Sequence, residues 1–138
     1  MFSNVVKQLD KQYTVICRQS QKILSERNLK TIPRYAGVYV LYYKEKPFYV
    51  GRSNNIYKRF MHQHLSKRND VASSSFRMHI KILKKITRYK EARNWIVKNC
   101  KVKFVKIDNY DDSILLEALL IRLWRKKYRL VNDNKYEL

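Results

Sequence analysis

Two short segments of β-branched and aromatic residues constrain the fold of this chain more than any other feature. Residues 35–43 (YAGVYVLYY) and 48–51 (FYVG) both have the composition typical of β-strands. A parallel pair of strands needs a crossover of a dozen residues or more, and the few residues between these segments cannot supply one. The two strands are therefore expected to form an antiparallel hairpin.

The expected register of the hairpin places its two glycines at matching positions. With the turn centred near Glu45, Tyr39 faces Gly51 across the strands, and Tyr39 and Tyr49 share one face. Gly37 and Gly51 are the two glycines of the whole chain. A glycine weakens a strand unless a phosphate or a neighbouring side chain must approach the backbone closely. The alternative is that both glycines permit strand twist.

The rest of the chain predicts helices around a small sheet. Apolar residues recur at helical spacing in four segments, 3–28, 53–67, 76–98 and 113–127. Ser53 or Asn54 is the expected N-cap of the second segment, and Asp111 or Asp112 that of the fourth. A break is expected near Thr87 in the third. Residues 102–107 alternate lysine with apolar side chains and predict a third strand.

These elements predict an α+β fold with a small three-stranded, mainly antiparallel sheet flanked by helices. The length of 138 residues suits one compact unit. Within that unit, residues 1–34 are expected to form an N-terminal helical extension, and residues 35–138 the domain that holds the sheet.

The chain carries a large excess of positive charge. Its 31 lysines and arginines exceed its 11 acidic residues by 20, and such a charge repels itself unless a polyanion is the normal partner. Asp70 and Glu91 are the two acids between Lys46 and Lys106, so that segment is expected to carry a phosphate-binding surface. Interleaved aromatic residues favour nucleic acid over two alternatives, a solvated basic surface and a membrane-surface peptide.

Cysteine content and hydropathy indicate the compartment. Cys17 and Cys100 are too few for a disulfide scaffold and lack the paired spacing of a zinc site, so a reducing, cytoplasmic interior is expected. The N-terminal residues lack the pattern of a signal peptide. Because no apolar run approaches the roughly 20 residues that span a bilayer, no membrane association is expected.

The hairpin carries a family resemblance. Gly37-Val38-Tyr39 and Tyr49-Val50-Gly51 resemble the two halves of the GIY-YIG nuclease signature. The resemblance covers roughly residues 35–134, and later family elements follow in the same order: Arg59, His62 or His64, Glu117 and Asn132.

Two departures from the family pattern stand out. The halves are separated by about nine residues where the family usually has about ten, so a tightened turn is expected. The family's histidine commonly falls four positions after the arginine, but Gln63 occupies that position, between His62 and His64. On a helix, residues 62 and 63 lie nearer the Arg59 face than residue 64. Both histidines remain candidates.

The resemblance implies a metal-dependent endonuclease, stand-alone or of restriction type, that hydrolyses phosphodiester bonds in DNA. It implies that Tyr39, with Tyr49 beside it, orients or deprotonates water, and that Arg59 binds the scissile phosphate. A tyrosine has a pKa near 10, so it serves as a base only where a cation favours the phenolate. Asn132 is expected to fix local structure near the site, with Asn134 as an alternative.

Glu117 can be considered without the family. It is the one acidic residue within the apolar stretch 114–121, and its helical neighbours include no cation. Desolvating an unpaired carboxylate costs several kcal/mol, so a metal ion or a basic group from elsewhere should meet it. The resemblance favours a metal, and Mg²⁺ or Mn²⁺ suits one hard carboxylate completed by water and phosphate oxygens. The alternative is a partly exposed glutamate at a helix edge.

Two more arginines are candidates for phosphate contacts, and two other functions fit the basic sequence. Arg52 and Arg77 are candidates to bind flanking phosphates, with an ordinary surface role as the alternative for each. DNA is the expected partner, and a homodimer is expected if both strands are cut at a palindrome. A non-catalytic basic nucleic-acid-binding module, or a structural protein of a ribonucleoprotein, would need no role for Glu117.

Overall fold

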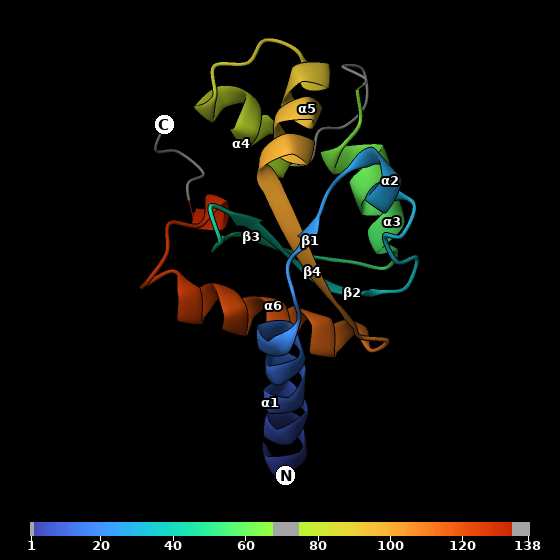
Figure 1. Ribbon diagram of the computed structural model, residues 1–138. Coiled ribbons are helices and arrows are strands. Elements are labelled where there is room, and N and C mark those ends of the chain that lie inside the picture. Colours follow the sequence, from blue (N-terminus) through green and yellow to red (C-terminus); the bar gives the residue numbers. More distant parts are fainter. Residues whose placement is uncertain (1, 68–74, 134–138) are drawn as a thin grey trace.

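The computed structural model describes residues 2–67 and 75–133 (Figure 1). In this part of the chain a four-stranded sheet has the order β1-β4-β2-β3, with every neighbouring pair antiparallel. The strands are β1 (Lys22–Ile23), β2 (Gly37–Tyr43), β3 (Lys46–Ser53) and β4 (Cys100–Lys106). The α+β class is confirmed. The expectation of three strands is wrong, because the N-terminal segment adds β1 to the outer edge of β4.

The hairpin of β2 and β3 has the expected register. Tyr39 faces Gly51 and Leu41 faces Tyr49, and the pairing shifts by one residue beyond Leu41. Its turn is tight because Lys44 and Glu45 both adopt positive φ, 51° and 67°. This is the pattern of a type I′ turn, whose twist matches that of the flanking strands.

The N-terminal segment is part of the folded body. Helix α1 (Phe2–Arg18) projects from it at one end (Figure 1) and buries Ile16 in the core. After α1, the Gln19 side-chain amide donates to the carbonyl of Phe104 (2.7 Å) and accepts from its N–H (2.8 Å). Strand β1 then pairs with β4, and the short helix α2 (Glu26–Leu29) follows. The segment is therefore helical in part only.

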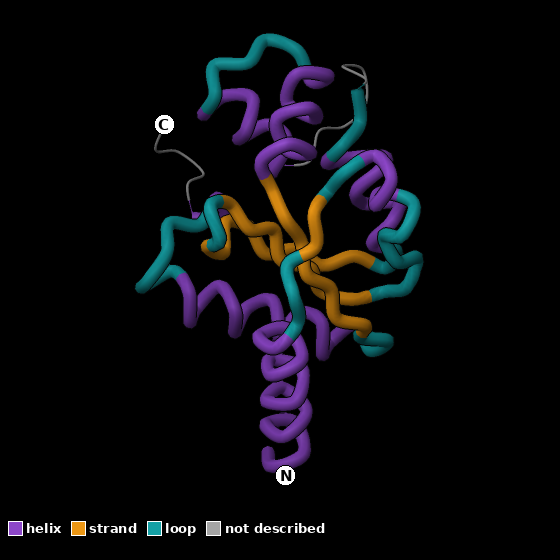
Figure 2. Tube along the Cα trace, viewed as in Figure 1, coloured by secondary structure: helices purple, strands orange, loops and turns teal. Residues whose placement is uncertain are grey.

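Two hydrophobic clusters lie on opposite faces of the sheet, and alternation along β2 assigns its residues to them. Val38 and Val40 pack with Leu116 and Leu120 of α6 (Tyr110–Trp124). The other face is covered by α3 (Ile56–Arg59), η1 (Phe60–His64), α4 (Ser75–Leu83) and α5 (Tyr89–Asn99). Tyr39 belongs to that second cluster. Figure 2 shows α1 and α6 on one side of the strands and the other helices gathered on the opposite side.

Two helices have N-cap residues other than the expected ones. The Asn55 side chain caps α3, accepting from the N–H of Lys58 at 3.0 Å, where Ser53 or Asn54 was expected. The Asn109 side chain caps α6, where Asp111 or Asp112 was expected. Each cap lies just before the first helical residue, so one or two residues decide which side chain reaches the free N–H groups. The break between α4 and α5 is confirmed. Across the residues described, no helix is both long enough and apolar enough to span a membrane.

Candidate active site

A cavity of about 210 Å³ brings together side chains from both hairpin strands and two helices. Its lining consists of Tyr39, Tyr49, Gly51, Arg52, Arg59 and Glu117. Residues from β2, β3, α3 and α6 thus meet at one place, although Glu117 is far from the hairpin in sequence. The cavity holds two phenols, two guanidinium groups and one carboxylate.

Gly51 makes room for Tyr39. The Tyr39 side chain is fully buried and lies directly over the Gly51 backbone, so a Cβ atom at position 51 would overlap the phenol ring and its oxygen. A glycine is needed at position 37 for a different reason, because a Cβ atom there would overlap the backbone carbonyl of Val105 on β4. Of the two explanations for the glycines, close approach is therefore the one that the structure supports.

His64, and not His62, contacts the pair of tyrosines in the cavity, Tyr39 and Tyr49. Its Nε2 atom lies 2.5 Å from the Tyr39 hydroxyl oxygen, and its ring packs edge-on against Tyr49 at a centroid distance of 5.7 Å. The exposed His62 side chain instead lines a separate hollow with Lys58.

The turn that carries His64 is a π-helix, and this explains the unusual spacing of the motif. The N–H of Leu65 donates to the carbonyl of Phe60 at 2.7 Å, which closes a turn one residue wider than an α-helical turn. The extra residue rotates His64 inward, five positions after Arg59. Gln63 does lie on the Arg59 face, as helical spacing predicts, while the wider turn brings His64 to Tyr39.

The buried pair of Tyr39 and His64 is neutral. Burial, followed by the charge of Tyr49, raises the pKa of Tyr39 well above 10, and Arg59 offsets this only in part. Burial, followed by the charges of Arg59 and Arg77, lowers the pKa of His64 to about 3. The condition for a tyrosine base, a cation strong enough to favour the phenolate, is therefore not met by the side chains present.

Arg59 is held by the residue that stands in the histidine position of the motif. Its Nη1 atom donates to Oε1 of Gln63 at 2.6 Å, across one turn of the helix. This contact directs the guanidinium along the cavity wall that it shares with Glu117. The sequence signal for this contact is the four-residue spacing between the two side chains, which places them on one face of the helix.

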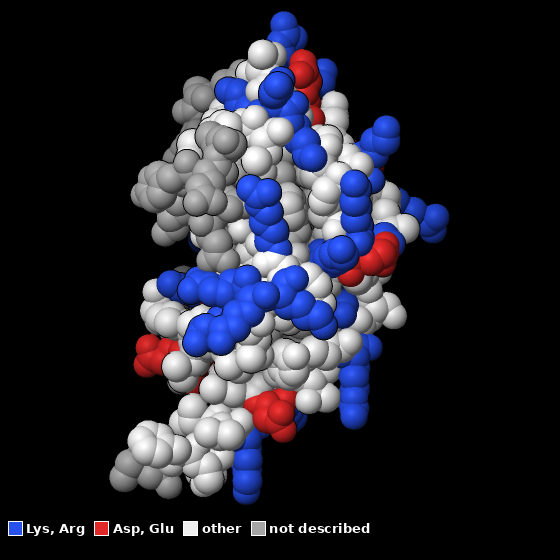
Figure 3. Space-filling view, turned by 90° about the vertical axis from the view of Figure 1, so that its left-hand side faces the viewer, with Lys and Arg blue, Asp and Glu red and all other residues white. Residues whose placement is uncertain are grey.

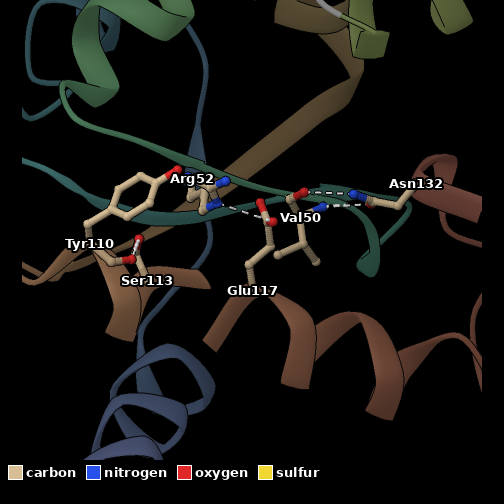
Figure 4. Close-up of polar contacts among 6 residues, drawn as sticks. All are labelled: Val50, Arg52, Tyr110, Ser113, Glu117 and Asn132. Carbon is tan, nitrogen blue, oxygen red and sulfur yellow. Dashed lines mark hydrogen bonds and ion pairs between the residues drawn. The ribbon is translucent and has the colours of Figure 1, made fainter. Parts of the chain in front are cut away.

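Glu117 meets a basic group from another element. Its Oε1 atom lies 3.5 Å from Nε of Arg52 on β3, and its side chain is 25% exposed. Figure 4 shows the Glu117 side chain rising from α6 towards Arg52, beside Tyr110. The Arg52 guanidinium also lies over the Tyr110 ring, 4.9 Å from its centroid. Burial raises the pKa of Glu117, and Arg52 opposes that shift.

Asn132 fixes the strand that carries Tyr49, Gly51 and Arg52. Its side chain accepts from the N–H of Val50 (2.9 Å) and donates to the carbonyl of Val50 (2.8 Å), as Figure 4 shows. Val50 lies between Tyr49 and Gly51. The turn η2 (Val131–Asp133) is therefore tied to the middle of β3. The alternative, Asn134, lies outside the described residues.

Arg77 is not available to bind phosphate. Its side chain is fully buried, donates from Nη1 to the carbonyl of Ser66 (2.8 Å) and lies 3.9 Å from the centroid of the Tyr89 ring. The expected phosphate contact is corrected to a structural role, in which Arg77 links α4, α5 and the segment after η1.

The donor set of the cavity suits a hard divalent cation. Its oxygen donors are the Glu117 carboxylate and the two phenols, and Glu117 is the one negatively charged group in the lining. Within residues 2–67 and 75–133, no three His, Cys, Asp or Glu side chains gather into a metal-binding cluster. A cation there would depend on Glu117, with water and phosphate oxygens completing its coordination, as Mg²⁺ commonly does.

Comparison with solved structures finds nuclease domains of the same kind. A tyrosine-to-phenylalanine variant of the GIY-YIG N-terminal endonuclease domain of UvrC from Thermotoga maritima, bound to its catalytic divalent cation, is 21% identical with a TM-score of 0.48 and covers 76% of this chain and 97% of that chain. The magnesium-bound domain is 22% identical with a TM-score of 0.44 and covers 75% and 92%. No curated protein matches the sequence.

A match to a protein-family model identifies the family of this chain. The model of the GIY-YIG catalytic domain matches residues 35–129, which include both halves of the hairpin motif, Arg59 and Glu117. The match extends over most of the sequence. The chain therefore belongs to the GIY-YIG family.

Proposed function

We propose that this endonuclease hydrolyses phosphodiester bonds of DNA at the cavity between β2, β3, α3 and α6, with Mg²⁺ or Mn²⁺ as its cofactor. The observation that carries the proposal is the convergence of Tyr39, Tyr49, Arg59 and Glu117 on one cavity. The net charge of +20 supports a polyanionic substrate.

Arg59 binds the scissile phosphate in this mechanism. Its planar guanidinium can donate two parallel hydrogen bonds to phosphate oxygens. The contact with Gln63 uses one nitrogen and leaves the others for the substrate. Charge that develops on the phosphate in the transition state is thereby stabilised by a donor already in position.

Tyr39 orients the attacking water. Because the Tyr39 pKa lies well above 10, the phenol keeps its proton at neutral pH. The low pKa of His64 keeps its ring neutral, and in the tautomer with the proton on Nδ1 its Nε2 accepts the Tyr39 proton. A lone pair of the Tyr39 oxygen can then accept a hydrogen bond from water, while Tyr49 forms the adjacent wall of the cavity. His64 acts here as a positioning residue for Tyr39.

Glu117 is the residue that would hold the divalent cation. When bound, such an ion supplies positive charge to the non-bridging phosphate oxygens and makes a nearby water more acidic. Arg52 favours the ionised form of the Glu117 carboxylate, because its charge and hydrogen bonding oppose the upward shift in pKa that burial causes. Arg52 and His62 are also the basic groups beside Arg59 that can contact phosphates flanking the cut.

Asn132 is a positioning residue for β3. Its two hydrogen bonds to Val50 hold the strand on which Tyr49 and Arg52 stand on either side. The asparagine contributes to activity only through that strand, since it does not line the cavity.

A plasmid-nicking assay tests the proposal. The wild-type protein is expected to convert supercoiled DNA to open circles in Mg²⁺ and to lose that activity in a chelator. Glu117→Ala should lower the rate at least a hundredfold, in line with the loss of one essential charged group. Glu91→Ala removes an exposed carboxylate from α5 and serves as the matched control with unchanged rate. Nicking that ignores both Mg²⁺ and Glu117→Ala would overturn the assignment.

A further inference from the structure

A second cleft, larger than the candidate active site, lies at the other end of β3. Its volume is about 860 Å³, and its walls come from the β2–β3 turn, the C-terminal end of α4 and the segment that follows α6. None of the residues assigned to catalysis lines it. The cleft therefore needs its own explanation.

The walls of this cleft are strongly basic. Five exposed cations line it, Lys44, Lys46, Lys84, Lys127 and Arg129. Among the described residues of its lining there is no acid, and the nearest carboxylate along the chain, that of Glu45, is paired with Lys101 at 2.7 Å. Figure 3 shows Lys and Arg side chains gathered in a band across this face, with acidic side chains at its margins. Such a wall attracts phosphate groups.

The cleft also offers aromatic surface. Tyr43, Phe48 and Tyr128 contribute rings to its walls. Tyr43 and Phe48 are packed against each other and against Trp95, whereas half-buried Tyr128 separates this cleft from a neighbouring one of about 480 Å³. The Tyr128 ring lines both clefts with Nζ of Lys127 5.5 Å from its centroid, so a planar ligand can stack on it beside a cation.

The size of the cleft favours an unpaired strand over a double helix as its ligand. A cleft of about 860 Å³ lies in the range that encloses ligands of small-molecule size. A double helix, whose major groove alone is about 12 Å wide, does not fit into it. Unpaired bases can be turned out and stacked on aromatic side chains, while lysine and arginine follow the backbone.

The cleft and the cavity lie on the same strand. Phe48 lines the cleft and Gly51 lines the cavity, three residues along β3. At the usual rise of a strand this is roughly 10 Å, the axial length of about three nucleotides of one DNA strand. Asn132 ties the segment that carries Tyr128 and Arg129 to the same strand.

We infer that this cleft binds unpaired nucleotides of the DNA substrate a few positions from the scissile phosphate, with Tyr128 as the stacking surface. The inference rests on the proposed DNA substrate and adds its class: DNA that contains a gap, flap or other single-stranded stretch beside the cut. Lys84, just after α4, and Lys127, in the segment after α6, contact the backbone of those nucleotides.

Fluorescence anisotropy in a chelator tests the inference without cleavage. The ratio of Kd values for a fully paired duplex and for the same duplex with a short single-stranded gap measures the preference. Wild type should favour the gapped DNA about tenfold, since stacking of one base is worth that much. Tyr128→Phe should keep the preference and Tyr128→Leu should abolish it. Equal Kd values for wild type, or an unchanged preference in Tyr128→Leu, would overturn the inference.

Two further measurements separate stacking from charge and from folding. A 2-aminopurine base in the gap should be quenched by wild type and Tyr128→Phe but not by Tyr128→Leu, with matching Tm values showing that all three fold. Lys84→Gln should weaken binding to gapped DNA and reduce its salt slope by about one, whereas the control Lys7→Gln on α1 should do neither. Quenching that persists in Tyr128→Leu contradicts the role of Tyr128.

Failure of the cleft inference can be distinguished from failure of the proposed function. Wild-type protein that nicks plasmid DNA in Mg²⁺ but binds paired and gapped DNA equally overturns the cleft inference alone. Protein that prefers gapped DNA but never nicks it overturns the proposed catalysis and leaves the cleft assignment standing.

Discussion

The hydroxyl oxygen of Tyr39 lies 2.5 Å from Nε2 of His64, and both side chains are buried between the sheet and the helices that cover it. This contact couples the central tyrosine of the site to a titratable ring that has no access to solvent. Protonation of that ring would place a charge in the core and would remove the acceptor of the Tyr39 proton. The contact therefore links acid stability to the geometry of the site.

Acid should destabilise the fold through His64. Its pKa is about 3 in the folded protein, below the ordinary 6.5, so the unfolded state binds the proton more readily. This contribution to stability is complete above pH 6.5 and declines as pH falls towards 3, by about 1.4 kcal/mol per pH unit. Denaturant titrations from pH 6.5 down to about pH 5 should give His64→Phe a shallower decline than wild type. Exposed His62→Gln should follow wild type, and identical slopes for wild type and His64→Phe would contradict the assignment.

The two glycines should respond differently to alanine. In Gly51→Ala the new methyl group overlaps the Tyr39 ring, so the phenol must move and the nicking rate should fall at least tenfold, with a loss of about 1–3 kcal/mol of stability. In Gly37→Ala the overlap is with the Val105 carbonyl, part of the backbone, which has less freedom to move. We expect the larger loss of unfolding free energy there. Equal activity of Gly51→Ala and wild type would show that the Tyr39 position is not required.

Removal of Arg52 should shift the acidic limb of the pH–rate profile. Arg52 lowers a Glu117 pKa that burial raises, so Arg52→Ala leaves the upward shift unopposed apart from Arg59. The ionised form of Glu117 is then lost at a higher pH, and the acidic limb of kcat/KM should move up. Arg122→Ala, which removes an exposed cation from α6, should leave the limb in place. A limb that does not move in Arg52→Ala would separate Glu117 ionisation from activity.

The hairpin was predictable from sequence because its constraints are local. A short turn between two β-type segments fixes register, and register alone placed Tyr39 opposite Gly51, as the structure has them. Glu117 could likewise be selected from sequence, since a lone carboxylate in an apolar helix requires a partner. The identity of that partner depended on how α6 crosses β3, which local patterns do not specify. Arg52 was therefore predicted as a phosphate contact and not as the ion-pair partner of Glu117.

The remaining differences share a cause in tertiary packing. His64 faces Tyr39 only because the chain widens into a π-turn at residues 60–64, and helical periodicity assumes α-helical turns throughout. Arg77 looks like a surface arginine in sequence, yet the packing of α4 on α5 buries it under Tyr89. Strand β1 has two residues, too few for a periodic signal. It forms because the hydrogen bonds of Gln19 to Phe104 hold the chain beside β4, and the edge of β4 then pairs with β1.

Asn132 should affect catalysis beyond its effect on stability. Asn132→Ala removes two hydrogen bonds to the Val50 backbone, which should cost about 1–3 kcal/mol and loosen the strand between Tyr49 and Arg52. Asn109→Ala removes the cap of α6, with a cost of about 1 kcal/mol, and serves as a control of comparable destabilisation. At a temperature where both variants are fully folded, Asn132→Ala should show a kcat at least tenfold below that of Asn109→Ala, with little change in KM. Equal kcat values for the two variants would show that Asn132 contributes to stability alone. Asn132 does not line the cavity, so it can influence catalysis only by holding β3 in place.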